Sequence, residues 1–124
     1  MHDFHVFVGL AEVPESSSVE EATEHLVAHE NADISIYCEV GPTLTVLLNP
    51  QRAFVMWIAQ GGDAGKHAVD SDTDGSDEHE FTLANGQVDE FSAADTVSRE
   101  AALEAVAHFL KTREASPRLA WRED

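Results

Sequence analysis

Three apolar runs separated by very short turns most constrain how this chain can fold. They are residues 32–40 (ADISIYCEV), 43–49 (TLTVLLN) and 52–59 (RAFVMWIA), and all three are rich in β-branched and aromatic residues. The turns between them, Gly41-Pro42 and Asn49-Pro50-Gln51, leave no room for a crossover helix. Because connections this short join only strands that run in opposite directions, the sequence predicts an antiparallel meander.

The N-terminal third of the chain predicts one further strand and a first helix. Residues 4–10 (FHVFVGL) alternate in polarity, which favours a strand over a secretory signal peptide because the segment also lacks a basic flank. Residues 19–29 carry apolar side chains at helical spacing, and Ser18 with Glu21 forms a capping box in front of them. We therefore expect a helix over 19–29.

The C-terminal half predicts a hairpin and a second helix. Asn85-Gly86 lies in the middle of residues 79–92 and is a strong signal for a tight turn between two antiparallel strands. In residues 96–113 Ser98 is a suitable N-cap. The apolar stripe of this second helix consists of Ala102, Leu103, Val106, Phe109 and Leu110.

The end of the chain carries its own structural signal. Pro117 cannot continue the helix, and Leu119 and Trp121 then lie on one side of a short segment. We expect this segment to form an edge strand or a lid that packs against the second helix. The predicted fold is a single α+β domain over residues 1–124, with a largely antiparallel sheet, two helices packed on one face and a short C-terminal strand.

The charge of the chain limits the partners it can bind. Its 124 residues carry 7 Lys and Arg against 24 Asp and Glu, a formal net charge of -17. Nucleic acid and anionic membranes are excluded as partners, because phosphate groups need cationic neutralisation. A basic protein would be attracted, but an acidic surface with few lysines also suits a protein kept soluble at high salt. The single cysteine, Cys38, indicates a reducing, cytoplasmic location.

Histidines and acidic residues raise the question of a metal site. His25 and His29 share one face of the first predicted helix, and residues 70–75 begin like a calcium loop, with Asp70, Asp72 and Asp74 at its first, third and fifth positions. The twelfth position, however, is Phe81 where a glutamate is needed. We therefore predict no metal, no cofactor and no catalytic residue, and hence a protein that is not an enzyme.

Trp57 lies on the third run of the meander, and both faces of that run are apolar. Val55 and Trp57 share one face, and Phe54, Met56 and Ile58 share the other. This pattern predicts a central strand with one face under the helices. The second face must then be covered by a loop, by another copy of the chain in a homodimer, or by a partner.

The order of these segments resembles the immunity proteins of the Imm type-one family, which are encoded beside polymorphic secreted toxins of bacteria. The resemblance runs from AFVMWIAQGG through EFSAADTVSREAALEAVAHFLKT to SPRLAWRED. The matching positions are Val97, Glu100, Ala101, Ala105, Phe109, Leu110, Pro117, Leu119 and Trp121. The resemblance implies a non-enzymatic inhibitor that binds a cognate toxin, commonly a nucleic-acid deaminase, and blocks its active site.

A toxin that acts on nucleic acid has a basic cleft, so the acidic side chains of this chain are the natural candidates to face it. The predicted partner-binding residues are Asp63, Asp70, Asp72, Asp74, Asp77, Glu78, Glu80 and Trp57. Two alternatives stay open. One is a stand-alone protein-binding or regulatory domain, and the other is a divalent-metal module built from the 70–80 loop with His67 or His79.

Overall fold

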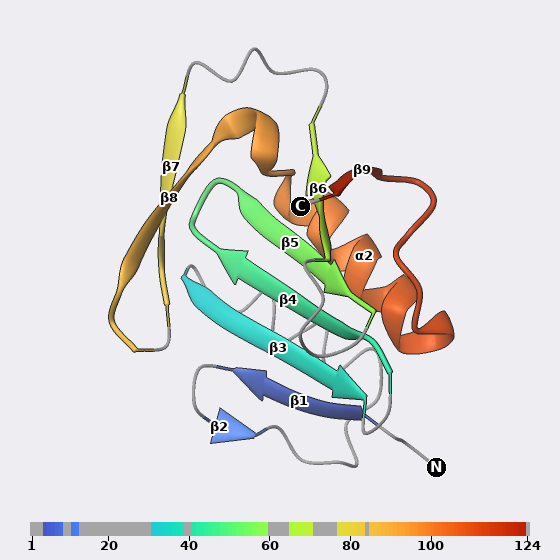
Figure 1. The fold of residues 1–124 in the computed structure, drawn as a ribbon. Coiled ribbons are helices and arrows are strands. Elements are labelled where there is room, and N and C mark those ends of the chain that lie inside the picture. The colour runs from blue at the N-terminus through green and yellow to red at the C-terminus, as the bar shows by residue number, and fades with distance from the viewer. Residues whose placement is uncertain are drawn as a thin grey trace.

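A seven-stranded antiparallel sheet forms the centre of the molecule (Figure 1). The computed structural model describes residues 4–8, 11–12, 31–38, 41–59, 65–70, 77–83 and 85–123. Within them the strand order of the main sheet is β2-β1-β3-β4-β5-β6-β9. The strands are β1 Phe4–Val8, β2 Ala11–Glu12, β3 Ala32–Cys38, β4 Thr43–Leu48, β5 Ala53–Ile58, β6 Lys66–Val69 and β9 Ala120–Glu123.

The predicted meander is confirmed and supplies the larger hydrophobic core. β3 pairs with β4 and β4 pairs with β5, all antiparallel, and Val46 lies opposite both Ile34 and Val55. Because side chains alternate along a strand, these three residues lie on one face of the sheet, and each is at most 1% exposed. Helix α2 (Arg99–Thr112) packs its buried residues, Ala102, Ala105, Val106 and Phe109, against this face.

Both ends of α2 are defined by specific contacts. The side chain of Ser98 accepts a hydrogen bond from the Ala101 N–H at 3.1 Å, so the predicted N-cap is confirmed. The helix ends at Arg113, whose φ of 66° is left-handed and whose N–H donates to the Phe109 carbonyl. The indole N–H of Trp57 donates to the Arg113 carbonyl at 3.1 Å, which ties this helix end to β5.

The C-terminal strand forms as the sequence predicts. β9 pairs with β6 at the edge of the sheet, and Leu119 and Trp121 pack against the larger core. The indole N–H of Trp121 donates to the Ser116 carbonyl at 2.8 Å. The tail is therefore anchored to the domain by an aromatic side chain that also satisfies its polar atom.

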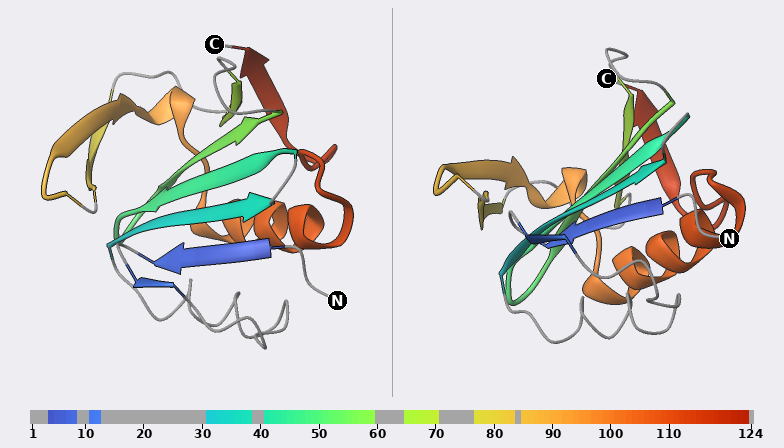
Figure 2. Two further views of the ribbon diagram at one scale, coloured as in Figure 1. Left: turned by 60° about the horizontal axis from the view of Figure 1, so that its bottom comes forward. Right: turned by 90° about the horizontal axis from the view of Figure 1, so that it is seen from below.

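The opposite face of the sheet is covered by a second, two-stranded sheet, β7 (Glu78–Thr82) and β8 (Val88–Ser92). Figure 2 shows α2 and this hairpin on opposite sides of the main sheet. Phe81 of the hairpin is buried against Leu47 and Phe54. Of the three coverings that the sequence allowed for this face, the structure shows a segment of the chain itself.

The fold agrees with the predicted α+β class, with three differences. In the described residues there is one α-helix, α2, rather than two; the helix expected over 19–29 lies outside these residues. The two-residue strand β2 and the 3-10 turn η1 (Ala93–Asp95) were not predicted. Both are too short to leave a periodic signal in the sequence.

Candidate partner-binding surface

The hairpin β7–β8 is built around the turn that Asn85-Gly86 predicts. Gly86 has a φ of +88°, a conformation that costs glycine little. The Asn85 side chain accepts a hydrogen bond from the Gln87 N–H at 2.9 Å, and the Leu83 N–H donates to the Gln87 carbonyl at 2.8 Å. The turn thereby fixes the register of the two strands, in which Glu80 lies opposite Glu90.

The inner face of the hairpin is held firmly against the sheet. Phe81 is fully buried, and the ring of Phe91 stacks on Phe54 with centroids 4.0 Å apart. The side-chain amide of Asn49 donates to the Glu80 carbonyl at 3.1 Å, and its oxygen accepts from the Arg52 N–H at 2.6 Å. The hairpin is therefore a fixed part of the fold, and its outer face is presented in one orientation.

That outer face carries a cluster of carboxylates. Glu78, Glu80 and Glu90 are all exposed and project from the side of the hairpin that points away from the sheet. A hydrogen bond with the Glu78 side chain, together with repulsion from the Glu78 and Glu80 charges, raises the pKa of Glu90 above its ordinary value. Like charges directly opposite each other destabilise a strand pair, so this arrangement works against the hairpin's own stability.

The segment that contains the hairpin has no basic residue that could relieve the repulsion among these glutamates. There is no Lys or Arg between Lys66 and Arg99. In the rest of the chain, Arg118 pairs with Glu104 and Arg122 with Asp95, while the Lys66 ammonium lies over the rings of Trp57 and Trp121. The strands of the hairpin, β7 and β8, therefore carry acidic residues and no Lys or Arg.

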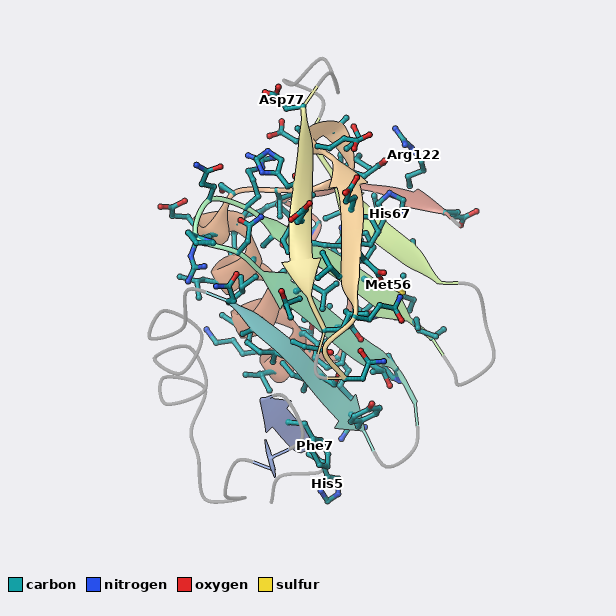
Figure 3. All side chains as sticks on the ribbon, turned by 90° about the vertical axis from the view of Figure 1, so that its left-hand side faces the viewer. His5, Phe7, Met56, His67, Asp77 and Arg122 are labelled. Atoms are coloured by element: carbon teal, nitrogen blue, oxygen red, sulfur yellow. The ribbon has the colours of Figure 1, made fainter. Side chains whose placement is uncertain are left out.

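The sequence-predicted site residues fall into three groups. Asp77, Glu78 and Glu80 come together at the hairpin, where Asp77 lies at its base (Figure 3) and accepts the Ala93 N–H through its carbonyl. Asp70 and Trp57 lie elsewhere. The third group, Asp63, Asp72 and Asp74, lies outside the described residues.

Asp70 and Trp57 take part in contacts that hold the fold together. The Asp70 carboxylate pairs with the Arg52 guanidinium at 3.0 Å, and the same guanidinium donates to the carbonyl of Thr96 at 2.8 Å. Trp57 lies on the α2 side of the sheet, half-buried, where it packs against the larger core. Trp57 therefore lies on the other side of the sheet from the hairpin, and the Asp70 carboxylate is paired with Arg52.

Glu90 is the one member of the cluster that the sequence analysis missed. The Asn85-Gly86 signal predicts the hairpin but not this pairing: a two-residue turn at these positions would place Glu90 opposite Phe81, whereas in the structure Leu83 pairs with Gln87 and Glu90 lies opposite Glu80. The acidic residues were instead grouped by their closeness along the chain, in the 70–80 segment. Pairing across the hairpin, and not sequence proximity, determines which carboxylates meet.

The structure gives the metal alternative no support in the residues it describes. No group of three or more His, Cys, Asp or Glu side chains in that part of the chain could hold a metal ion. His67 is buried, and its Nε2 lies 3.0 Å from the Asp95 carboxylate, which also accepts from Arg122 at 2.7 Å (Figure 3). The histidine pair at positions 25 and 29 lies outside the described residues.

Comparison with known proteins identifies the family. The family model for the immunity protein Imm1 matches residues 8–123, nearly the whole chain. The chain belongs to the Imm1 family of immunity proteins. The match covers the meander, the acidic hairpin, α2 and β9, so the resemblance seen in the C-terminal segments extends over the described fold from Val8 to Glu123.

Membership in the Imm1 family indicates a protein whose partner is a toxin. A search of curated proteins found no match. In the described part of this Imm1 chain, no helix is both long enough and apolar enough to cross a membrane.

Proposed function

We propose that this chain protects its producer by binding a cognate secreted toxin and covering the toxin's active-site cleft with the outer face of the β7–β8 hairpin. The toxin would be an enzyme that acts on nucleic acid, such as a deaminase. One observation supports the proposal: in a chain of an immunity-protein family, Glu78, Glu80 and Glu90 are held together on a hairpin whose two strands carry no Lys or Arg.

The chemistry of such a target fits this surface. An enzyme that binds nucleic acid has Lys and Arg side chains along its cleft to neutralise phosphates. A row of fixed carboxylates can replace those phosphates, and it also accelerates the encounter of the two proteins. The repulsion among the three glutamates, unfavourable in the free chain, is relieved when cationic side chains of the toxin approach them. Part of the binding free energy therefore comes from removing this repulsion.

A growth-rescue assay tests the proposal. The toxin domain encoded beside this chain is expressed in a susceptible host together with either the parent chain or the variant Glu78→Gln/Glu80→Gln/Glu90→Gln. We expect the parent to restore growth and the triple variant to restore it poorly, because the variant keeps the fold but loses the negative charge of the hairpin.

The matched control removes the same number of charges elsewhere. Glu100, Glu114 and Glu123 are exposed and lie on or beyond α2, away from the hairpin. Their combined change to Gln is expected to leave rescue intact. Equal loss of rescue in both triple variants would show that only net charge matters, as expected for adaptation to salt. Failure of the parent chain to rescue growth would refute the proposed function itself.

A further inference from the structure

Strand β8 has an open edge. In the described residues the second sheet contains only β7 and β8, so β8 has a strand neighbour on one side alone. β7, by contrast, lies against β3 and β4 of the main sheet. An open strand edge presents unpaired backbone donors and acceptors and can be extended by another chain.

The register shows which backbone groups face this open edge. The Ala93 N–H donates to the Asp77 carbonyl, and the Leu83 N–H donates to the Gln87 carbonyl, both at 2.8 Å. Antiparallel pairs alternate between bonded and non-bonded, so Glu80–Glu90 and Thr82–Val88 are non-bonded pairs. The N–H and C=O groups of Val88 and Glu90 consequently point away from β7.

A contact on the other strand supports this assignment. The register requires the Glu80 carbonyl to point out of the hairpin on the β7 side, and there it accepts a hydrogen bond from the Asn49 side chain. No such side chain reaches β8: within the part of the chain that the structure describes, the outward backbone groups of Val88 and Glu90 have no hydrogen-bond partner.

The side chains beside this edge specify what could bind there. Val88 is 52% exposed and is one of two large hydrophobic residues left exposed in the described part of the chain. Glu90, two positions along the same strand, lies on the same outer face together with Glu80 and Glu78. A strand added to β8 would therefore meet an apolar side chain and then a cluster of negative charge.

We infer that β8 binds an extended segment of the toxin as an additional strand, with an apolar side chain of that segment beside Val88 and a Lys or Arg beside Glu90. The inference rests on the proposed function and goes beyond it in naming the backbone edge and the pattern of the bound segment. Backbone hydrogen bonds to Val88 and Glu90 provide the affinity, and the alternating apolar and basic side chains provide the specificity.

Proline substitution tests the inference because the two edges of the hairpin offer a matched pair. Val88→Pro removes an N–H that faces the open edge, whereas Thr82→Pro removes the corresponding N–H on the β7 side of the same cross-strand pair. Neither change breaks a hydrogen bond between β7 and β8. We expect Val88→Pro to weaken toxin binding about tenfold, as for the loss of one backbone hydrogen bond at an interface, and Thr82→Pro to leave it unchanged.

Amide hydrogen exchange provides a second readout that needs no variant. In the complex of the parent chain with its toxin, the amides of Val88 and Glu90 should exchange more slowly than in the free chain, while the Thr82 amide should not change. The inference would be overturned if the toxin bound tightly but the Val88 and Glu90 amides were not protected and Val88→Pro had no effect on binding. The proposed function would then remain intact.

A toxin-independent probe separates the two claims. A capped peptide of about nine residues that alternates lysine and valine has the length of an ordinary strand. At high concentration it should protect the Val88 and Glu90 amides, and a glutamate–valine peptide should not. If the toxin fails to bind the parent chain, the proposed function fails. In that case the lysine–valine peptide still tests whether β8 accepts an added strand. Equal exchange of the Val88 and Glu90 amides with both peptides would refute that claim.

Discussion

The two faces of the main sheet are covered in different ways, and in the proposed function this difference separates stability from recognition. On the α2 face, apolar residues of the helix and of β9 close the larger core, Arg118 pairs with Glu104, and the Lys66 ammonium lies over the rings of Trp57 and Trp121. On the opposite face, a small hairpin is fixed by a few aromatic contacts and directs three glutamates outward. The first arrangement pairs opposite charges, whereas the outer face of the hairpin accumulates one kind of charge.

We propose that this contrast marks where the chain gives up stability for function. Charge pairs on the α2 side are arranged to attract. On the hairpin, Glu80 and Glu90 face each other in a non-bonded pair, where side chains approach most closely. A domain selected only for stability has no reason to keep that arrangement. The variants below break one side of the molecule at a time, from the largest expected effect to the smallest.

Removal of Phe109 should damage the α2 side most. This side chain is fully buried in the larger core, so Phe109→Ala should lower the free energy of unfolding by about 4 kcal/mol. Urea unfolding measures the loss. Toxin affinity, measured where the variant is still folded, should match that of the parent. An affinity loss in the folded variant would contradict the division between the two faces.

Removal of Phe81 should damage both stability and recognition. Phe81 is fully buried in the smaller core under the hairpin, and Phe81→Ala should cost about 3 kcal/mol. Because the change loosens the hairpin, toxin affinity should also fall in the folded variant, which calorimetric titration measures. Unchanged affinity would show that the hairpin does not carry the binding surface.

Removal of Trp121 tests the tail. The ring remains half-exposed, so Trp121→Ala should cost about 2 to 3 kcal/mol, at the low end for an aromatic truncation. A thermal melt measures the loss, and toxin binding should not change at a temperature where the variant is folded. A melting temperature equal to that of the parent would show that the tail is not anchored by this ring.

The smallest effect concerns the pH dependence of stability. The pKa of Glu90 is raised in the folded chain above its ordinary value of 4.5, because of the hydrogen bond with Glu78 and repulsion from Glu78 and Glu80. The folded state therefore binds this proton more tightly than the unfolded state. The resulting stabilisation is present below pH 4.5 and is lost as pH rises through the raised pKa.

The Glu90→Gln variant lacks this contribution. Its free energy of unfolding should therefore decline less than that of the parent chain as pH rises from about 4.5 toward neutrality. Urea midpoints across that range provide the comparison, with Glu114→Gln, an exposed glutamate beyond α2, as the control. The same pH slope in the parent and in Glu90→Gln would show that the glutamates of the hairpin do not interact in solution.

Most of the fold could be predicted from local signals. The short turns at Gly41-Pro42 and Asn49-Pro50 determine the direction of β3, β4 and β5, and Ser98 marks the start of α2. Trp121 was expected to anchor the tail and does so. These features were accessible because each depends on residues close together in sequence, whose conformational preferences are strong.

The composition of the candidate site could be predicted only in part, because it depends on contacts between distant segments. Asp70 resembles its acidic neighbours in sequence, but the fold brings Arg52 to its carboxylate and gives it a structural partner. Glu90 is remote from the 70–80 segment and joins Glu80 only through the hairpin register. Which face of the sheet the hairpin covers was likewise not encoded in any single segment, since both faces of β5 are apolar.

The most direct test of the central claim is the rate at which chain and toxin associate as a function of salt concentration. If the outer face of the hairpin faces the toxin, association of the parent chain should be fast at low salt and should slow steeply as salt is added. The variant Glu78→Gln/Glu80→Gln/Glu90→Gln should associate about tenfold more slowly at low salt and show a shallower dependence, whereas the Glu100, Glu114 and Glu123 control should follow the parent. Identical rates and slopes for the hairpin variant and the control would contradict the account.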